Sequence, residues 1–176
     1  CASGEEAYTL AIILREAIPD SSWDVSVRAV DINPAALERA ANARFSPWAL
    51  RETPPHVQDR WFRAAGRDLT LADEIRTAVT FEQRNLTADD ADLWRPDFYD
   101  VIFCRNVIMY FSPEKMRAVV ARIAGALAPG GTVVDMAYAD TATLTFSNVV
   151  VPSTGLYNID FRYAFGPGLF PNVTNR

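Results

Sequence analysis

The sequence predicts an α/β protein built around a doubly wound, mostly parallel sheet. Two observations support this fold class. Segments with strand character alternate with segments of helical periodicity along most of the chain, and the strand segments end in polar residues. In such sheets the carboxyl ends of the strands share one edge, where ligands bind. The polar residues at these strand ends are therefore candidates for a binding site.

The chain opens on a turn that leads directly into a helix. Residues 4–17 carry a broad apolar surface, and Ser3 stands where a helix N-cap is expected. No strand segment comes before this turn, so we expect the given chain to be truncated and to lack the first strand of the sheet. Residues 25–32 alternate and then become apolar, which is typical of a buried parallel strand, and Asp31 lies at its carboxyl end.

A second helix and a third strand follow. Asn33 and Pro34 have the residue types of an N-cap and of a first helical residue. Residues 45–78 are polar and aromatic with scattered prolines, which indicates an insertion of short elements. Residues 79–85 predict the third strand of the sheet, counting the missing first one.

Strand and helix alternate again in the second half of the chain. Residues 99–104 form the strongest strand segment. Residues 113–127 have the apolar spacing of an amphipathic helix, which Ser112 would cap. The Ala-Pro-Gly-Gly stretch at residues 128–131 predicts a helix stop and a turn, and residues 132–137 predict a fifth strand.

The character of the sequence changes after Tyr138. Residues 141–176 show no helical pattern, and residues 157–163 alternate strictly after a turn at residues 152–155. We therefore expect a C-terminal β-hairpin. On this basis the chain divides into an α/β domain over residues 1–140 and a β-rich tail beyond it.

Charge and hydropathy narrow the classes of function. The 176 residues include 22 acidic and 17 basic side chains, for a formal net charge of −5. Nucleic acids and anionic membranes attract basic surfaces, so this balance argues against both as general partners. No apolar run approaches the roughly 20 residues of a helix that crosses a bilayer. We expect no nucleic-acid partner and no membrane span.

The few cysteines and histidines narrow the chemistry further. Cys1 and Cys104 are the two cysteines, which favours a reducing cytoplasm over a disulfide framework. For Cys104 a small buried apolar side chain is preferred over a nucleophile. His56 is the single histidine, so a histidine-based metal site or a Ser-His-Asp triad has little support. It stands in a proline-rich stretch, where we expect an exposed loop residue.

Acidic residues near the first turn and the second strand indicate a nucleoside-like ligand. Asp31 stands where nucleotide-binding folds place a carboxylate that accepts from ribose hydroxyls, and the alternative is a plain strand-end or helix-capping aspartate. The turn at residues 3–6 contains Gly4 but no G-x-G-x-x-G pattern. Glutamates at a helix start repel phosphate and attract ammonium, although a surface role matched to the helix dipole is preferred for Glu5. These features favour a cationic ligand without phosphate, such as the methionine end of S-adenosylmethionine.

Polar residues also end the third and fourth strands. Asn85 follows the third strand and precedes Leu86. Its amide can recognise an adenine edge because it both donates and accepts hydrogen bonds. The simpler alternative is an asparagine that only forms a turn. Arg105 and Asn106 interrupt an otherwise apolar segment. Buried polar groups are costly without partners, which makes this pair a site candidate, and the alternative is that both side chains reach solvent.

Several segments together resemble the chemotaxis receptor methyltransferases of the CheR type. They are CASGEEAYTLAI, AVDINPAALERA, FEQRNL, YDVIFCRNVIMYF and LAPGG, in this order. The resemblance implies a class I methyltransferase (Rossmann-like) fold with S-adenosyl-L-methionine as cofactor and S-adenosyl-L-homocysteine as product. It also implies a cytoplasmic monomer that methylates glutamate side chains of methyl-accepting chemoreceptors, giving γ-glutamyl methyl esters.

The same resemblance implies roles for individual residues. The cofactor-contacting positions fall on Glu6, Asp31, Asn85, Leu86, Arg105 and Asn106. Tyr110 falls near the transferred methyl group, and it is assigned to catalysis together with Arg105. A carboxylate is already a nucleophile at neutral pH, so positioning and desolvation are expected to supply most of the rate enhancement.

The sequence departs from the family pattern at both ends. We expect the given chain to lack the family's N-terminal helical domain, and its fifth strand continues into Asp135 to Asp140 where the family has Gly-His-Ser-Glu. The tail over residues 141–176 resembles part of a carbohydrate-binding β-sandwich module, although its hairpin could replace the last two strands of the sheet. Two alternatives to the enzyme follow: a non-catalytic domain that binds S-adenosylmethionine or its product, and a carbohydrate-binding fragment confined to the tail.

Overall fold

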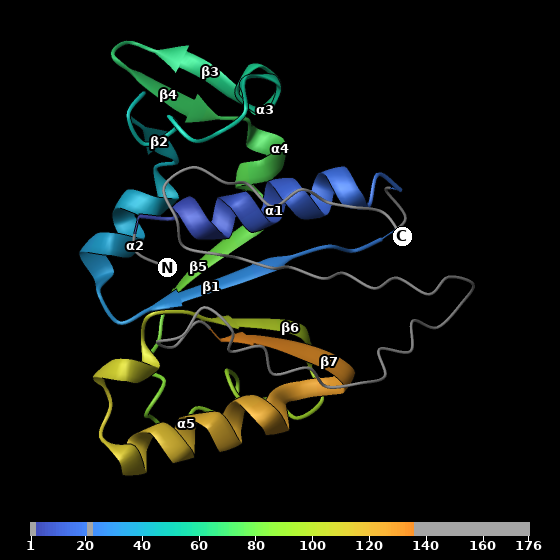
Figure 1. Ribbon diagram of the computed structural model, residues 1–176, viewed down its shortest axis with the longest axis vertical. Coiled ribbons are helices and arrows are strands. Elements are labelled where there is room, and N and C mark those ends of the chain that lie inside the picture. The colour runs from blue at the N-terminus through green and yellow to red at the C-terminus, as the bar shows by residue number, and fades with distance from the viewer. Residues whose placement is uncertain (1–2, 21–22, 136–176) are drawn as a thin grey trace. The chain divides into compact units, whose positions relative to one another are not determined.

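The computed structural model describes residues 3–20 and 23–135 and shows a mixed α/β protein (Figure 1). Its contacts divide the chain into two compact units, residues 1–85 and residues 86–176. Among the described residues, the strands form two parallel pairs and one three-stranded antiparallel sheet. The parallel pairs confirm the predicted α/β class. The predicted hairpin and tail, and the division at residue 140, lie outside the described residues.

A parallel pair of strands forms the centre of the first unit. Strands β1 (Val27–Asp31) and β5 (Val79–Gln83) run in register from Val27 opposite Val79 to Asp31 opposite Gln83. Helix α1 (Glu5–Ala17) precedes β1 and helix α2 (Pro34–Ala41) follows it. The sequence predicted each of these elements, with ends that differ by a few residues.

The two helices of the first unit begin in different ways. At α2 the side chain of Asn33 accepts a hydrogen bond from the backbone N–H of Ala35, and Pro34 is the first helical residue, as predicted. At α1 the predicted cap at Ser3 is wrong, because Gly4 occupies the N-cap position and no side chain caps the helix. Gly4 has a φ of 91°, a left-handed conformation that glycine adopts without steric cost. The chain therefore turns one residue later than the sequence suggested.

Tyr8 ties the elements of the first unit together. Its side chain is 2% exposed, and its ring meets the rings of Phe45 and Phe81 edge-on. Its hydroxyl donates to the carbonyl of Ala40 near the end of α2, at 3.0 Å. Burial raises the pKa of Tyr8, against a smaller lowering by the charge of Arg76. The phenol therefore stays protonated at neutral pH and keeps α1 bonded to α2.

The chain between α2 and β5 folds into short elements, as the sequence indicated. Strands β2 (Arg44–Phe45), β3 (Phe62–Ala65) and β4 (Asp68–Leu71) form an antiparallel sheet in the order β2-β4-β3 (Figure 1). Two short helices, α3 (Pro55–Trp61) and α4 (Asp73–Arg76), complete the insertion.

The proline-rich stretch of the insertion starts a helix where a loop was expected. Pro55 is the first residue of α3, a position at which the missing N–H of proline costs nothing. His56 therefore lies in the first turn of α3 and not in a loop. Its side chain is exposed, as predicted.

The second unit is built from a parallel pair and one long helix. Strand β6 (Tyr99–Cys104) leads through a short 3₁₀ helix, η1 (Ile108–Tyr110), to α5 (Pro113–Ala126) and then to β7 (Leu127–Asp135). Strands β6 and β7 pair in parallel. The hydroxyl of Ser112 accepts from the backbone N–H of Lys115, so the predicted cap of α5 is confirmed.

The predicted turn at residues 128–131 is instead an irregularity inside β7. Tyr99 lies opposite Leu127, but Val101 lies opposite Thr132, so β7 bulges between these two pairs. A Cβ on Gly131 would stand 3.0 Å from three backbone carbonyl oxygens, two of which belong to β6. Glycine is needed here because the bulged backbone passes close to its neighbour, and the strand continues through the bulge.

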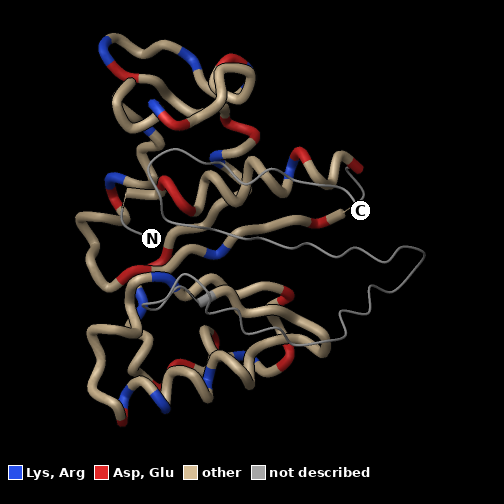
Figure 2. Tube along the Cα trace, in the orientation of Figure 1, with Lys and Arg blue, Asp and Glu red and all other residues tan. Residues whose placement is uncertain are grey.

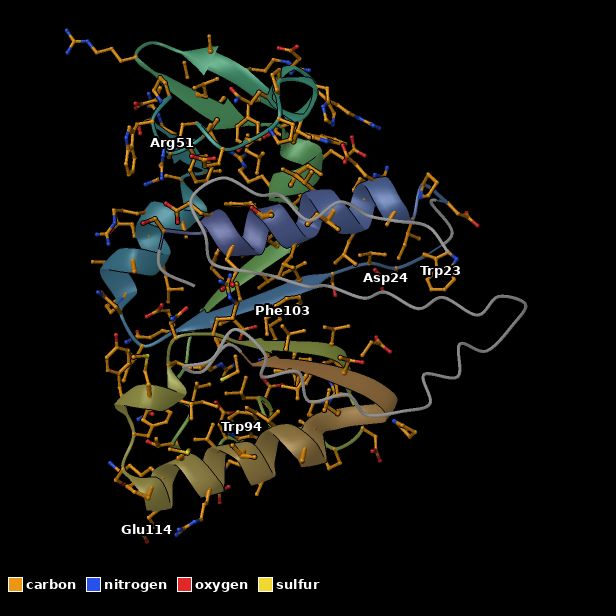
Figure 3. The ribbon with its side chains drawn as sticks, viewed as in Figure 1. Trp23, Asp24, Arg51, Trp94, Phe103 and Glu114 are labelled. Carbon is orange, nitrogen blue, oxygen red and sulfur yellow. The ribbon has the colours of Figure 1, made fainter. Side chains whose placement is uncertain are left out.

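A separate apolar core holds the second unit together. Val119 and Ile123 of α5 pack with Cys104, Ile108 and Val133, and none of the five is more than 6% exposed. Cys104 is 6% exposed and forms no disulfide, which confirms the preferred interpretation of a small buried side chain. The indole of Trp94 packs against the same cluster (Figure 3).

Charged side chains of both signs are interspersed along the trace of each unit (Figure 2). Among the described residues, none of the helices combines the length and the apolar character that crossing a membrane requires.

Candidate functional site

Asp31 lies at the carboxyl end of β1 and is half-buried. Its Oδ1 atom accepts a hydrogen bond from the backbone N–H of Asn33 at 2.9 Å, which fixes the turn from β1 into α2. One carboxylate oxygen of Asp31 therefore has the structural role that was the alternative to ligand binding. An ionised carboxylate has about four acceptor positions on two oxygens, so the turn engages one of them. The place of Asp31 at the carboxyl end of β1 is the position from which a carboxylate accepts from ribose hydroxyls in nucleotide-binding folds.

The turn before α1 brings a glycine into close contact with α2. A Cβ added at Gly4 would lie 3.0 Å from the Cβ of Ala40 and 3.1 Å from a ring carbon of Tyr8. Glu5 and Glu6 follow in the first turn of α1, where Glu5 is exposed and Glu6 is half-buried. The exposure of Glu5 agrees with the surface role preferred for it. Two carboxylates at this end of the helix make the turn acidic, which suits an ammonium group and repels phosphate.

Asn85 follows the last paired residue of β5 by two positions. The backbone N–H of Arg84 donates to the carbonyl of Asp31 at 3.0 Å, so the pairing with β1 continues to the residue before Asn85. The amide of Gln83 also reaches across, donating to the carbonyl of Ile32 at 3.3 Å. Parallel pairing thus brings Asp31 and Asn85 to adjoining strand ends, as the strand order in the sequence suggested. The side chain of Asn85 is exposed there.

A charged network on the same two strands was missed by sequence reasoning. The guanidinium of Arg28 donates to both carboxylate oxygens of Glu82, at 2.7 and 2.8 Å. The guanidinium of Arg84 donates to one of these oxygens through two nitrogens, at 2.9 and 2.7 Å. The sequence signal was the presence of opposite charges on two predicted strands. Only the register shows that these charges meet.

The network makes the stability of the first unit depend on acid pH. The hydrogen bonds from Arg28 are the largest cause that holds the pKa of Glu82 below its ordinary value of 4.5. Burial raises this pKa by a smaller amount, and the hydrogen bonds from Arg84 and the charges of both arginines lower it further. A lowered folded-state pKa contributes stability that is complete above the unfolded-state pKa and is lost as the pH falls through the folded value. Below pH 4.5 we therefore expect the unfolding free energy to fall more steeply for the wild type than for Glu82→Gln, in urea titrations from pH 7 to pH 3. Parallel curves would contradict this assignment.

The polar residues that follow β6 lie in the second unit. Arg105 and Asn106 directly follow Cys104, the last residue of the strand. Asn106 is exposed and has a φ of 53°, a left-handed conformation that asparagine tolerates better than most residues. The Nε and Nη2 atoms of Arg105 are buried, so its guanidinium does not simply extend into solvent. Asn106 is therefore exposed to solvent, as the alternative interpretation had it, whereas the guanidinium of Arg105 is partly buried.

Two other predicted site residues also lie in the second unit. Leu86 is half-buried and packs against the second core, and its carbonyl accepts from the guanidinium of Arg122 at 3.3 Å. Tyr110 ends the 3₁₀ helix and is 77% exposed. The hydrogen bond to its carbonyl holds the backbone of Leu86 in place, whereas Tyr110 is largely exposed.

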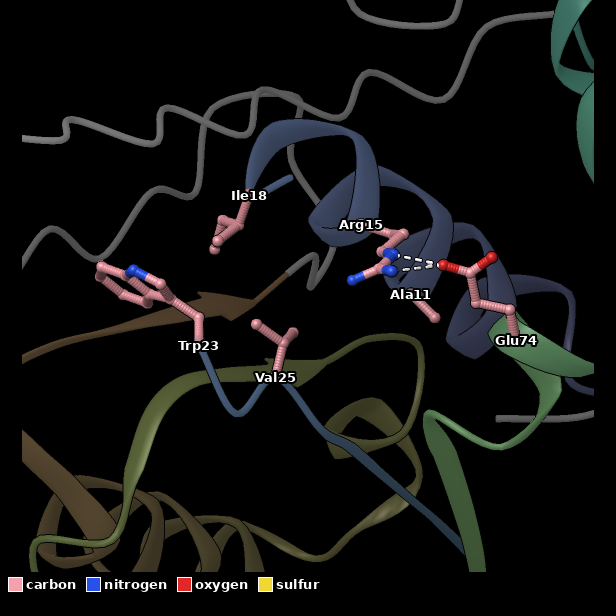
Figure 4. Close-up of a pocket in the computed structure, with 6 residues that line it drawn as sticks. All are labelled: Ala11, Arg15, Ile18, Trp23, Val25 and Glu74. Atoms are coloured by element: carbon pink, nitrogen blue, oxygen red, sulfur yellow. Dashed lines mark hydrogen bonds and ion pairs between the residues drawn. The ribbon is translucent and has the colours of Figure 1, made fainter. Parts of the chain in front are cut away.

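A pocket in the first unit lies away from these strand ends. It has a volume of about 180 Å³ and is lined by Ala11, Arg15, Ile18, Trp23, Val25 and Glu74 (Figure 4). It thus lies before the start of β1, whereas Asp31 ends that strand. Its volume is also below the roughly 300–1,000 Å³ of typical small-molecule pockets. We assign it no ligand.

The residues of the first unit fit S-adenosylmethionine chemically. The acidic turn at Glu6 suits its ammonium group, Asp31 suits ribose hydroxyls, and the amide of Asn85 suits an adenine edge. The glycine that the backbone requires at position 4 places the acidic helix start against α2. Among the described residues, no cluster of three or more His, Cys, Asp or Glu could hold a metal ion.

Comparisons with known proteins point to one family. Residues 1–134 match the family described as CheR methyltransferase, SAM binding domain. Chemotaxis protein methyltransferase 2 of Vibrio cholerae is 36% identical over 134 residues, which cover 74% of this chain and 46% of that protein. Chemotaxis protein methyltransferase 1 of Pseudomonas aeruginosa is 33% identical over 137 residues, which cover 74% of this chain and 49% of that protein.

Two further matches extend the comparison. An uncharacterised 104.1 kDa protein of Rhodobacter capsulatus is 33% identical over 135 residues, which cover 74% of this chain and 14% of that protein. Among solved structures, an O-methyltransferase family protein from Burkholderia thailandensis matches 76% of this chain and 30% of its own, with a TM-score of 0.44 and 22% identity. The chain spans less than half the length of each of these curated relatives.

Proposed function

Because this chain belongs to the CheR methyltransferase family and carries its S-adenosylmethionine-binding domain, we propose that the protein methylates glutamate side chains of a chemoreceptor. The products would be γ-glutamyl methyl esters and S-adenosylhomocysteine. We also propose that it acts in the cytoplasm as a monomer. The observation that supports the proposal is the pair of adjoining strand ends in the first unit: Asp31 is opposite Gln83, and its carbonyl accepts from the N–H of Arg84, the residue before Asn85.

The residues of this chain would bind and orient the cofactor. Glu6 would receive the ammonium group of the methionine part, Asp31 the ribose hydroxyls, and Asn85 with Leu86 the adenine. The resemblance to the family also assigns cofactor contacts to Arg105 and Asn106, which follow β6. When bound, S-adenosylmethionine supplies a methyl group on a positively charged sulfur, which a carboxylate displaces in line.

The protein's catalytic contribution would be positioning and exclusion of water. A substrate glutamate is ionised at neutral pH, so no base is needed to generate the nucleophile. Tyr110 is proposed to lie near the transferred methyl group, and Arg105 to assist there with its charge. Holding the two reacting groups in line, in a site that water cannot enter, would account for most of the acceleration.

The proposal is tested in two steps. Calorimetry should first detect binding of S-adenosylhomocysteine and no binding of an oligosaccharide panel. Incubation with S-[methyl-³H]adenosylmethionine and receptor cytoplasmic fragments should then transfer label that alkali releases as methanol, as expected of a carboxyl ester.

Each outcome of these steps has a defined meaning. Absence of S-adenosylhomocysteine binding would contradict the whole proposal. Binding without label transfer would contradict the enzymatic part and favour a regulatory domain. Oligosaccharide binding would favour the module that residues 141–176 resemble, and label that resists alkali would contradict the ester.

A further inference from the structure

The network of Arg28, Glu82 and Arg84 lies on the face of the parallel pair opposite α1. Ala29 and Phe81 belong to or pack against the core cluster that contains Tyr8 of α1. Side chains alternate between the two faces of a strand, so Arg28 and Glu82 point to the other face. The side chains of the network are 18%, 23% and 29% exposed. The network is therefore half-sheltered and separate from the core.

The network ends where the proposed cofactor contacts begin. Glu82 is paired in register with Val30, the residue before Asp31. Arg84 directly precedes Asn85, and its backbone N–H donates to the carbonyl of Asp31 at 3.0 Å. One residue, Arg84, thus holds Glu82 through its side chain and Asp31 through its backbone.

The bonding pattern is stronger than that of an ordinary surface ion pair. Exposed pairs contribute little because two long side chains lose entropy and water screens their charges. Here one carboxylate accepts four hydrogen bonds from two guanidinium groups, all between 2.7 and 2.9 Å. Charge-assisted and bidentate bonds of this kind add geometric specificity as well as energy. The carboxylate of Glu82 therefore links Arg28 of β1, three residues before Asp31, to Arg84, the residue before Asn85.

We infer that Glu82 is a positioning residue for the cofactor: by holding Arg28 and Arg84, it sets the spacing between Asp31 and Asn85. This inference rests on the proposed function. A ligand that bonds to Asp31 through its ribose and to Asn85 through its base requires the two side chains at one separation. Groups of a binding site must be held within about 0.5 Å of the productive geometry. Loss of Glu82 would let the end of β5 move and would weaken contacts to the adenosine part.

Glu82→Gln is the test, because it keeps the size of the side chain and removes its charge. We expect S-adenosylhomocysteine to bind about tenfold more weakly in calorimetry, which corresponds to about 1.4 kcal/mol of binding free energy. Binding of 5′-methylthioadenosine, which lacks the amino-acid part, should weaken by the same factor. In the Asp31→Asn background the same change should cost less, because coupled residues are not additive.

Glu74→Gln is the matched control. It removes the ion pair between Arg15 and Glu74, which links α1 and α4 in the same unit. We expect its affinity for S-adenosylhomocysteine to equal that of the wild type. Arg28→Lys keeps the charge and loses the bidentate contact, so it provides a second measurement if Glu82→Gln does not fold.

The outcomes separate this inference from the proposed function. Wild-type protein that does not bind S-adenosylhomocysteine would overturn both. Wild-type binding with Glu82→Gln within twofold of it, or with Glu74→Gln weakened equally, would overturn the positioning role alone. The same holds if Arg28→Lys, used in place of an unfolded Glu82→Gln, binds like the wild type.

Discussion

Replacement of Asp31 by alanine is expected to weaken S-adenosylhomocysteine binding about 100-fold, because two charge-assisted hydrogen bonds of about 1.5 kcal/mol each would be lost. The carboxylate stands at the end of β1, where the ribose of a nucleoside ligand is expected. The same substitution removes the acceptor that fixes the turn to Asn33. Part of the effect would therefore come from the turn, and a second variant is needed to separate the two.

Asp31→Asn makes this separation. Its amide oxygen can still accept from the N–H of Asn33, so the turn into α2 is kept, whereas the charge and one acceptor oxygen are lost. We expect the melting temperature to fall less than for alanine while most of the loss of affinity remains. Calorimetry and thermal unfolding of both variants provide the measurement. An asparagine variant that binds like the wild type would show that Asp31 serves only the turn.

Gly4→Ala is expected to destabilise the first unit by roughly 2–4 kcal/mol, since a left-handed residue with a side chain costs about 1–2 kcal/mol and overpacking adds a similar amount. The new methyl group would meet the Cβ of Ala40 at 3.0 Å and the backbone of α2 at 3.2 Å. Because α1 would have to move away from α2, the bond from Tyr8 to Ala40 would be strained as well. Urea unfolding monitored by circular dichroism measures the loss.

Gly66→Ala is the matched control, because it measures the free-energy cost of a left-handed residue without the steric contact. Gly66 has a φ of 70° in the turn between β3 and β4, and a Cβ there would meet nothing within 4 Å. We expect a loss of about 1 kcal/mol, the cost of the left-handed conformation alone. Equal losses at both positions would show that Gly4 is required for its φ and not for the close approach to α2.

Much of the fold was predictable because its strands and helix starts depend on residues that are close together in the sequence. The run from Tyr99 to Cys104 is mostly apolar and follows a turn, and it forms the strand predicted for it. Asn33 with Pro34 and Ser112 with Pro113 are helix-start signals, and both helices begin there. These signals depend on neighbours within a few residues, so they survive without knowledge of the rest of the fold.

The errors came from positions where distant residues decide the local conformation. Ser3 has the right residue type for a cap, but contact of Gly4 with α2 moves the helix start. The glycines near residue 130 suggested a turn, but the carbonyl groups of β6 keep this stretch in the sheet as a bulge. The prolines before His56 predicted a loop, but Pro55 starts α3.

By itself, the sequence determined the α/β class, the order of the main strands and helices, and the motifs that identify the family. Only the tertiary structure decided which side chains meet. The register of β1 on β5 places Asp31 beside the residue before Asn85, and it brings Glu82 between Arg28 and Arg84. The physical reason is that pairing between strands separated by 50 residues depends on the whole core that aligns them, whereas helix starts and strand patterns depend on neighbours along the chain.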